Sequence, residues 1–130
     1  MYTIQKTQAF TDTITFENGG GQNGLTIQIQ LRITPELASQ YRTIQLRLIS
    51  LQKQIQVDPS NSETISKIGE CIVRTFSLLF GEENTKEIVR FYENDLDQML
   101  LDVFPYIQNV IVPEIGKIAK ARKQQFRKRF

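Results

Sequence analysis

The side chains most closely spaced for acid–base or metal chemistry are four carboxylates in the C-terminal half of the chain, Glu93, Asp95, Asp97 and Asp102. Carboxylates in such a group could bind a hard cation or act as a general acid and a general base. The spacing of Asp95 and Asp97 lacks the downstream glycine and glutamate of a calcium-binding loop. Acidic residues are also common in the first turn of a helix, where the helix dipole favours them. We therefore favour a solvated, acidic helix start over a metal or catalytic site.

The chain also lacks the residues that other common catalytic sites use. The chain has no histidine, which removes Ser-His-Asp and Cys-His arrangements together with the commonest general base. Its single cysteine, Cys71, cannot build a zinc site and lies in an apolar helical pattern typical of a core residue. The glycine-rich stretch 18–24 is followed by a strand pattern, which favours a turn over a phosphate site. We predict a protein that is not an enzyme and uses no cofactor and no metal.

The C-terminal segment is strongly basic, although the net charge of the 130 residues is only +2. Residues 117–130 contain seven basic and no acidic residues, so residues 1–116 carry a net charge of −5, with acids concentrated in 82–102. Such a segment could contact an acidic protein surface or nucleic acid, or be a solvated helix end. Phe126 and Phe130 could stack on bases or anchor a protein partner. The predicted partner-binding residues are Lys117, Lys120, Arg122, Lys123, Phe126, Arg127, Lys128 and Arg129.

Two N-terminal stretches alternate apolar and polar residues with a period of two, which predicts β-strands. They cover residues 10–16 and 25–33, and the four glycines between them predict a hairpin. An isolated hairpin is only marginally stable, so its apolar face must cover the helices or a second subunit. An exposed edge of the second strand would also suit oligomerisation by strand addition. The predicted self-association residues are Ile27, Ile29 and Leu31.

From Thr34 onward the apolar period becomes helical. Thr34 and Pro35 form a helix start, and the apolar residues that follow are spaced by three and four up to Ile55. A second helix is expected from about residue 60 to Gly81, and a third over 85–92 with Asn84 or Thr85 as its cap. Asn94 or Asp95 would cap a fourth helix.

Two prolines interrupt the last helical pattern. Pro105 is expected to kink or split the fourth helix, and Pro113 to end it or to begin a last short helix. The predicted fold class is therefore α+β, an N-terminal antiparallel β-hairpin followed by a bundle of four to five helices. We expect a single domain over residues 1–130, with the hairpin in 1–33, a helical body in 34–116 and a basic helical tail in 117–130.

The cellular location is predicted from what the sequence does not contain. No apolar run near the N-terminus resembles a signal peptide, and no stretch reaches the ~18 apolar residues of a membrane-spanning helix. A single cysteine fits a reducing compartment. We expect a soluble protein in the cytoplasm of its host cell, with no membrane contact.

The C-terminal half resembles a family of small phage proteins. The likeness rests on residues 80–85 (FGEENT), the helix at 87–92 and the run 105–130, in which a Leu-Phe-Gly-Glu helix end leads through short acidic helices into a basic last helix. These features are similar to the C-terminal part of tail assembly chaperones and related tail proteins of siphophages and prophages of Gram-positive bacteria. The likeness covers about half of the chain, and no motif in the N-terminal half adds to it.

This resemblance implies a non-enzymatic role. Proteins of that family hold the long, aggregation-prone tape measure protein until tail tube subunits polymerise around it, and many self-associate. A longer, frameshifted form from the same start is also implied. The family offers no catalytic residues. The expected partners are therefore the tape measure or another tail protein and further copies of the chain, with a nucleic-acid-binding regulator as the alternative.

Overall fold

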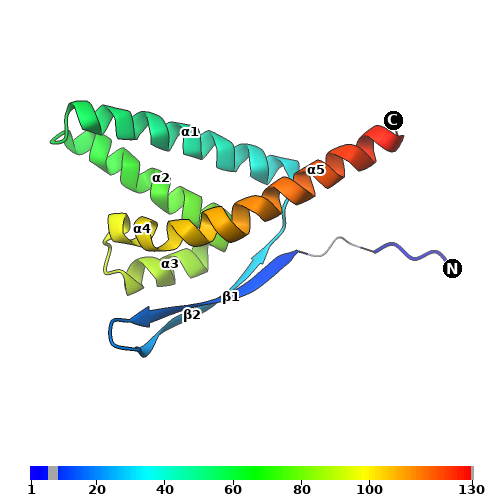
Figure 1. Cartoon of the computed structure of the whole chain (residues 1–130), viewed down its shortest axis with the longest axis horizontal. Coiled ribbons are helices and arrows are strands. Elements are labelled where there is room, and N and C mark those ends of the chain that lie inside the picture. The colour runs from blue at the N-terminus through cyan, green and yellow to red at the C-terminus, as the bar shows by residue number, and fades with distance from the viewer. Residues whose placement is uncertain (6–8, 130) are drawn as a thin grey trace.

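The computed structural model describes residues 1–5 and 9–129, without the side chains of Gln22, Asn23, Ala119, Arg122 and Arg129. It has an α+β fold, as predicted: an antiparallel hairpin precedes a set of helices (Figure 1). In chain order the elements are β1 (Phe10–Asn18), β2 (Gln22–Leu31), α1 (Pro35–Val57), α2 (Ser62–Phe80), α3 (Glu82–Phe91), α4 (Leu96–Tyr106), the π-helical turn η1 (Ile107–Ile111) and α5 (Val112–Arg129).

The hairpin contains a bulge near its tip. Phe16 pairs with Leu25, but Asn18 pairs with Gln22, so β2 has one residue more than β1 over this stretch. Gly24 lies in the bulge, and a Cβ atom there would lie 1.8 Å from the carbonyl oxygen of Phe16. The strand was predicted to start at residue 25, but the bulge lets β2 begin at Gln22.

Helices α1 and α2 begin at side-chain caps. Thr34 Oγ1 accepts a 3.0 Å hydrogen bond from the Leu37 amide and Pro35 follows as the first helical residue, as predicted. Asn61 accepts a 3.1 Å bond from the Thr64 amide at the start of α2. The two helices run antiparallel (Figure 1) and bury a small cluster that includes Cys71, which is 3% exposed. The prediction that Cys71 is a core residue is confirmed.

Helix α3 starts earlier than the sequence indicated. It begins at Glu82, not Thr85, because Gly81 with φ of 85° both ends α2 and caps α3, so no loop separates them. Asn84 therefore lies inside the helix, and the prediction that it or Thr85 caps α3 is wrong. Asp95 caps α4 by accepting a 3.2 Å bond from the Gln98 amide, one of the two predicted caps.

The two prolines do not break the C-terminal helix. Helix α4, η1 and α5 follow one another without a gap, and Ile107 at the α4–η1 junction keeps helical angles. Pro105 removes the amide that would bond to the carbonyl of Leu101, which is 68% exposed. Pro113 is the second residue of α5 and lies just after η1, at whose end the Val112 amide bonds to the Ile107 carbonyl. The chain therefore passes from body to basic tail within one helix.

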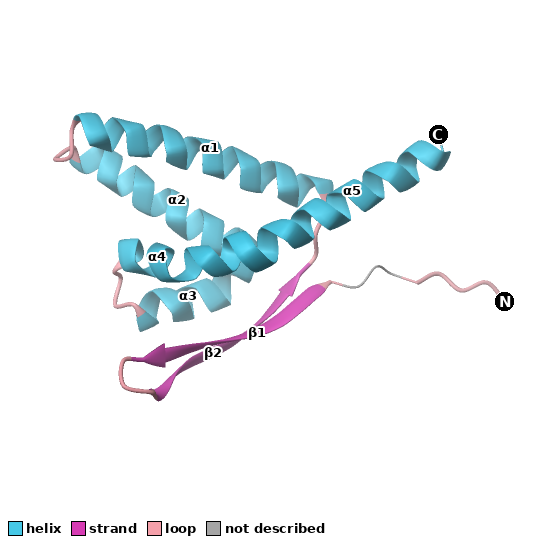
Figure 2. Cartoon of the chain, viewed as in Figure 1, coloured by secondary structure: helices cyan, strands magenta, loops and turns pink. Residues whose placement is uncertain are grey.

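The main core lies between the hairpin and the helices. The apolar face of the hairpin packs against α2, α3 and the α4–η1–α5 helix, and the hairpin runs along one side of the helices (Figure 2). Phe76, Ile88, Met99 and Ile111 are fully buried at its centre. Self-association through the hairpin face does not fit this arrangement, because the three residues named for it lie within the chain's own core, only 2–5% exposed: Ile27, Ile29 and Leu31.

Candidate interaction surfaces

Helix α5 leaves the body part-way along its length. Ile111 and Ile115 are buried in the core and Ile118 is half-buried, but the described side chains beyond it are exposed. No apolar stripe continues past this point, so packing does not hold the end of the helix against the body. Figure 1 shows this end of α5 projecting away from the other helices.

The projecting helix carries a row of exposed cations. Lys120, Lys123 and Arg127 are spaced by three and four residues and therefore share one face of the helix. Lys117 Nζ lies 3.7 Å from Oε1 of the half-buried Glu114. The other predicted cations whose side chains the structure describes have no described carboxylate within 4.0 Å, namely Lys120, Lys123, Arg127 and Lys128.

The remaining predicted partner-binding residues are only partly placed. Phe126 is 68% exposed on the same stretch of helix. The side chains of Arg122 and Arg129, and the whole of Phe130, lie outside the described residues. The basic surface formed by Lys120, Lys123, Phe126, Arg127 and Lys128 is called the α5 surface.

Like charges at these spacings repel. Pairs of cations three or four residues apart weaken a helix by roughly 0.2–0.5 kcal/mol each. Lys120 with Lys123, and Lys123 with Arg127, are such pairs. The negative end of the helix dipole offsets part of this cost. A partner that supplies carboxylates would remove the repulsion, so the α5 surface is suited to an anionic partner.

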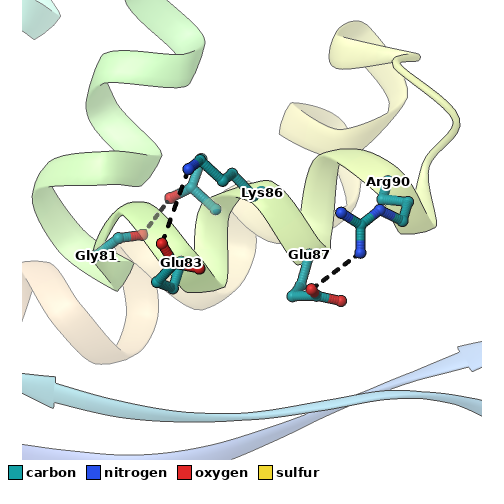
Figure 3. A network of polar contacts seen from close by, with 6 residues as sticks. Gly81, Glu83, Lys86, Glu87 and Arg90 are labelled. Carbon is teal, nitrogen blue, oxygen red and sulfur yellow. Dashed lines mark hydrogen bonds and ion pairs between the residues drawn. The ribbon is translucent and has the colours of Figure 1, made fainter.

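Acidic side chains gather at α3 and the start of α4. Two of them form exposed ion pairs along α3, Glu83 with Lys86 at 3.8 Å and Glu87 with Arg90 at 3.0 Å (Figure 3). Three further carboxylates have no described basic side chain within 4.0 Å, those of Glu82, Glu93 and Asp97. These three are called the acidic end.

Two of the four clustered carboxylates, Asp95 and Asp102, stabilise the fold. Asp95 caps α4, and Asp102 accepts hydrogen bonds from Tyr92 Oη at 3.0 Å and from Gln98 Nε2 at 2.7 Å. Burial, with help from the bond to Asp102, raises the pKa of Tyr92 to about 12. Among residues 1–5 and 9–129, no three carboxylate or thiol groups are placed to hold a metal ion together.

One backbone group on each edge of the hairpin bonds to a side chain. Thr13 and Gln28 face each other across the two strands. Asn84 Nδ2 of α3 donates a 2.8 Å bond to the Gln28 carbonyl, so that carbonyl points away from β1. On the opposite edge, Asp12 Oδ1 accepts a 2.8 Å bond from the Thr13 amide. Each of these bonds leaves one backbone group fewer for strand addition.

Asp12 is tied to the helices as well. Its Oδ2 accepts a 2.6 Å hydrogen bond from Tyr106 Oη, and burial followed by this bond raises the pKa of Tyr106 above its usual value. Asp12 occupies an inward-facing position opposite Ile29. Asp12 and Tyr106 were not among the residues predicted to be important, and Asn84 was predicted only as a helix cap. A signal for Asp12 was present, because it interrupts the apolar face formed by Phe10 and Ile14.

No helix in the part of the chain that the structure describes is both long and apolar enough to cross a membrane. The sequence matches no protein-family model, no curated protein and no solved structure.

Proposed function

We propose that this chain is a non-enzymatic tail assembly chaperone of a phage or prophage, which binds the tape measure protein through the α5 surface and keeps it soluble during tail assembly. The observation that carries the proposal is the row of exposed cations on a helix that projects from a closed body. A helix of this kind can lie along a long helical client and pair with its acidic side chains. Phe126 adds an apolar contact in the same place.

The resemblance to tail assembly chaperones, which rests on the sequence, also supports the proposal. Gly81 joins α2 to α3 without a loop, and Asn84 connects α3 to the hairpin. Both belong to the FGEENT stretch that carries the likeness. This stretch positions the acidic helices, while the α5 surface provides the client contact.

Co-expression with a client tests the proposal. A tape measure protein encoded beside this chain is expected to be largely insoluble alone and soluble with the wild-type chain. The variant Lys120→Glu/Lys123→Glu/Arg127→Glu should lose this effect. The matched control makes the same charge change at three exposed residues of α1, Arg42→Glu/Arg47→Glu/Lys53→Glu, and should keep it. A client equally insoluble with and without the wild-type chain would refute the proposal.

A nucleic-acid-binding regulator is the second candidate. The exposed Phe126 between Lys123 and Arg127 favours it, because an aromatic ring among cations can stack on a base. This function requires binding to duplex or single strands whose affinity falls steeply with salt. The chaperone function requires no such binding at physiological salt, so a filter-binding titration separates the two.

A further inference from the structure

Both faces of α1 carry apolar side chains. The buried face, which includes Leu48 and Leu51, packs on α2. On the opposite face Leu46 and Ile49 are 59% and 48% exposed, and Figure 2 shows α1 at the edge of the molecule. Single exposed apolar residues are ordinary on a protein surface, whereas an aligned group of them indicates a contact surface.

Leu46 and Ile49 belong to a line of exposed residues with helical spacing. The line has spacings of four, three and four positions and comprises Arg42, Leu46, Ile49 and Lys53, which we call the α1 seam. Residues three and four positions apart share one face of a helix. The same spacing marks the contact line of a coiled coil, along which a second helix packs lengthwise. The α1 seam therefore has the geometry of a helix-binding surface.

Both ends of the α1 seam are cationic. Arg42 and Lys53, and also Arg47 beside the seam, have no described carboxylate within 4.0 Å. The one acidic residue within α1 is Glu36, in its first turn. Two seams from two copies would place cations against cations, in a parallel as well as in an antiparallel arrangement, and like charges across an interface are unfavourable. A helix that has carboxylates on either side of an apolar centre complements the seam in charge and in polarity.

The α1 seam is too narrow for a membrane surface. A helix that lies in a membrane surface buries a long apolar face among the lipids. The long apolar face of α1 is already packed against the rest of the chain, and the seam itself offers only Leu46 and Ile49. A partner helix needs no more than such a narrow line, because its own side chains interlock with it.

We propose that the α1 seam binds an amphipathic helix of a second protein, one that carries carboxylates on either side of an apolar centre. In this complex Leu46 and Ile49 pack against apolar side chains of the partner helix, and Arg42 and Lys53 pair with its carboxylates. The partner differs from the client of the proposed function, because α1 and α5 point in different directions (Figure 1) and one straight helix does not follow both. The inference does not rest on the proposed function, because it uses no residue of the α5 surface.

Titration of the full-length chain with designed peptides tests the inference. The first peptide has about three heptads, with leucine at the core positions of each heptad and glutamate at the positions beside them. Its glutamates repel one another, so it is largely unfolded by itself. The second peptide has lysine in place of each glutamate. We expect saturable binding of the acidic peptide, with a gain of helix measured by circular dichroism, and no binding of the basic peptide.

The apolar centre of the seam is tested by Leu46→Gln/Ile49→Gln. This variant should bind the acidic peptide at least about tenfold more weakly, because two aliphatic contacts are lost. The matched control Ile65→Gln/Leu101→Gln changes the same two residue types on α2 and α4, where the side chains are 51% and 68% exposed, and should bind like the wild type. All four side chains are exposed, so both variants should fold, which their circular dichroism without peptide checks.

The charges are tested separately. Arg42→Gln/Lys53→Gln should weaken binding of the acidic peptide about three- to tenfold, as expected for the loss of two exposed ion pairs. The α5 variant Lys120→Glu/Lys123→Glu/Arg127→Glu should bind the acidic peptide like the wild type, because its seam is intact.

Absence of binding by the acidic peptide, or equal binding of the two peptides, would overturn the inference. Binding that Leu46→Gln/Ile49→Gln leaves unchanged would also overturn it, because α5 or another surface would then hold the peptide. Vesicles of phosphatidylglycerol that bind the wild type but not this variant would make a membrane the occupant of the seam. Copies of the wild type that assemble, and that separate in this variant, would make a second copy the occupant. Either result would overturn the inference.

The client test separates this inference from the proposed function. Leu46→Gln/Ile49→Gln should keep a client as soluble as the wild type does, because its α5 surface is unchanged. Loss of solubilisation in this variant would place the α1 seam in the client contact and overturn the separate partner. A client that stays insoluble with a wild-type chain that binds the acidic peptide would overturn only the chaperone function.

Discussion

Tyr106 Oη donates a 2.6 Å hydrogen bond to Asp12 Oδ2, joining the last turn of α4 to β1 across 94 positions of the chain. Asp12 also caps the edge of β1 through the Thr13 amide. One carboxylate thus fixes the hairpin to the helices and bonds to one amide at its open edge.

Replacing Tyr106 by phenylalanine should remove this link. A hydrogen bond to a charged acceptor contributes about 1.5–3 kcal/mol, and Asp12 keeps its bond to Thr13, so we expect a loss of about 1.5 kcal/mol in the free energy of unfolding. Urea denaturation followed by circular dichroism measures it. Tyr2→Phe is the control, because Tyr2 is 89% exposed and should leave the midpoint unchanged. Equal midpoints for all three proteins would show that the bond contributes nothing.

Stability should fall in alkaline solution. Burial and the bonds to carboxylates raise the pKa of Tyr92 to about 12 and that of Tyr106 further, from about 10 in the unfolded chain. A raised pKa means that folding favours the protonated phenol, so this stabilisation is complete below pH 10 and is lost as the pH rises toward 12. Urea midpoints at about pH 9 and about pH 11 should differ, and the difference should shrink in Tyr92→Phe/Tyr106→Phe. If the urea midpoints of that variant differed by as much as those of the wild type, groups other than these two tyrosines would cause the loss of stability.

Gly24→Ala should destabilise the hairpin. The added Cβ would lie 1.8 Å from the Phe16 carbonyl oxygen and 3.1 Å from the Phe91 ring, so the bulge would have to move. Overpacking of this kind costs about 1–3 kcal/mol, and contact with rigid backbone favours the upper part of that range. Gly19→Ala is the matched control at the open tip, where a Cβ meets nothing within 4 Å. Thermal melts should separate the two variants, and equal melting temperatures would argue against the bulge.

Ile29→Ala distinguishes core packing from self-association. Ile29 is 2% exposed in the main core, so truncation should cost about 2–5 kcal/mol whatever the protein concentration. Unfolding is best measured in high salt, where charged surfaces are screened. Leu46→Ala on α1, where the side chain is 59% exposed, should change stability by less than about 0.5 kcal/mol. A cost for Ile29→Ala that appears only at high protein concentration would instead place this residue at an interface between copies.

The features that were predicted correctly from the sequence are those determined by residues close together in the chain. Thr34 and Pro35 set the start of α1 through contacts within one turn, and the alternation in β2 follows from strand geometry alone. The start of α3 was missed because it depends on the positive φ of Gly81, which the residue type permits but does not require.

Long-range contacts could not be read from the sequence. The bonds from Asn84 to Gln28 and from Tyr106 to Asp12 join residues 56 and 94 positions apart. Likewise, the alternation around Ile29 shows that one face of the hairpin is apolar but not what covers it. For the candidate site, the composition predicted the basic tail. That the tail projects from the body depends on where the packed side chains of α5 end, which is after Ile118.

The most direct test of the account is a binding titration of the purified chain with the tape measure protein, or with a soluble helical segment of it. The account predicts saturable binding that Lys120→Glu/Lys123→Glu/Arg127→Glu abolishes and that the α1 control Arg42→Glu/Arg47→Glu/Lys53→Glu preserves. Binding of equal affinity by the wild type and both variants would contradict the role of the α5 surface, and absence of binding by the wild type would contradict the proposed function itself.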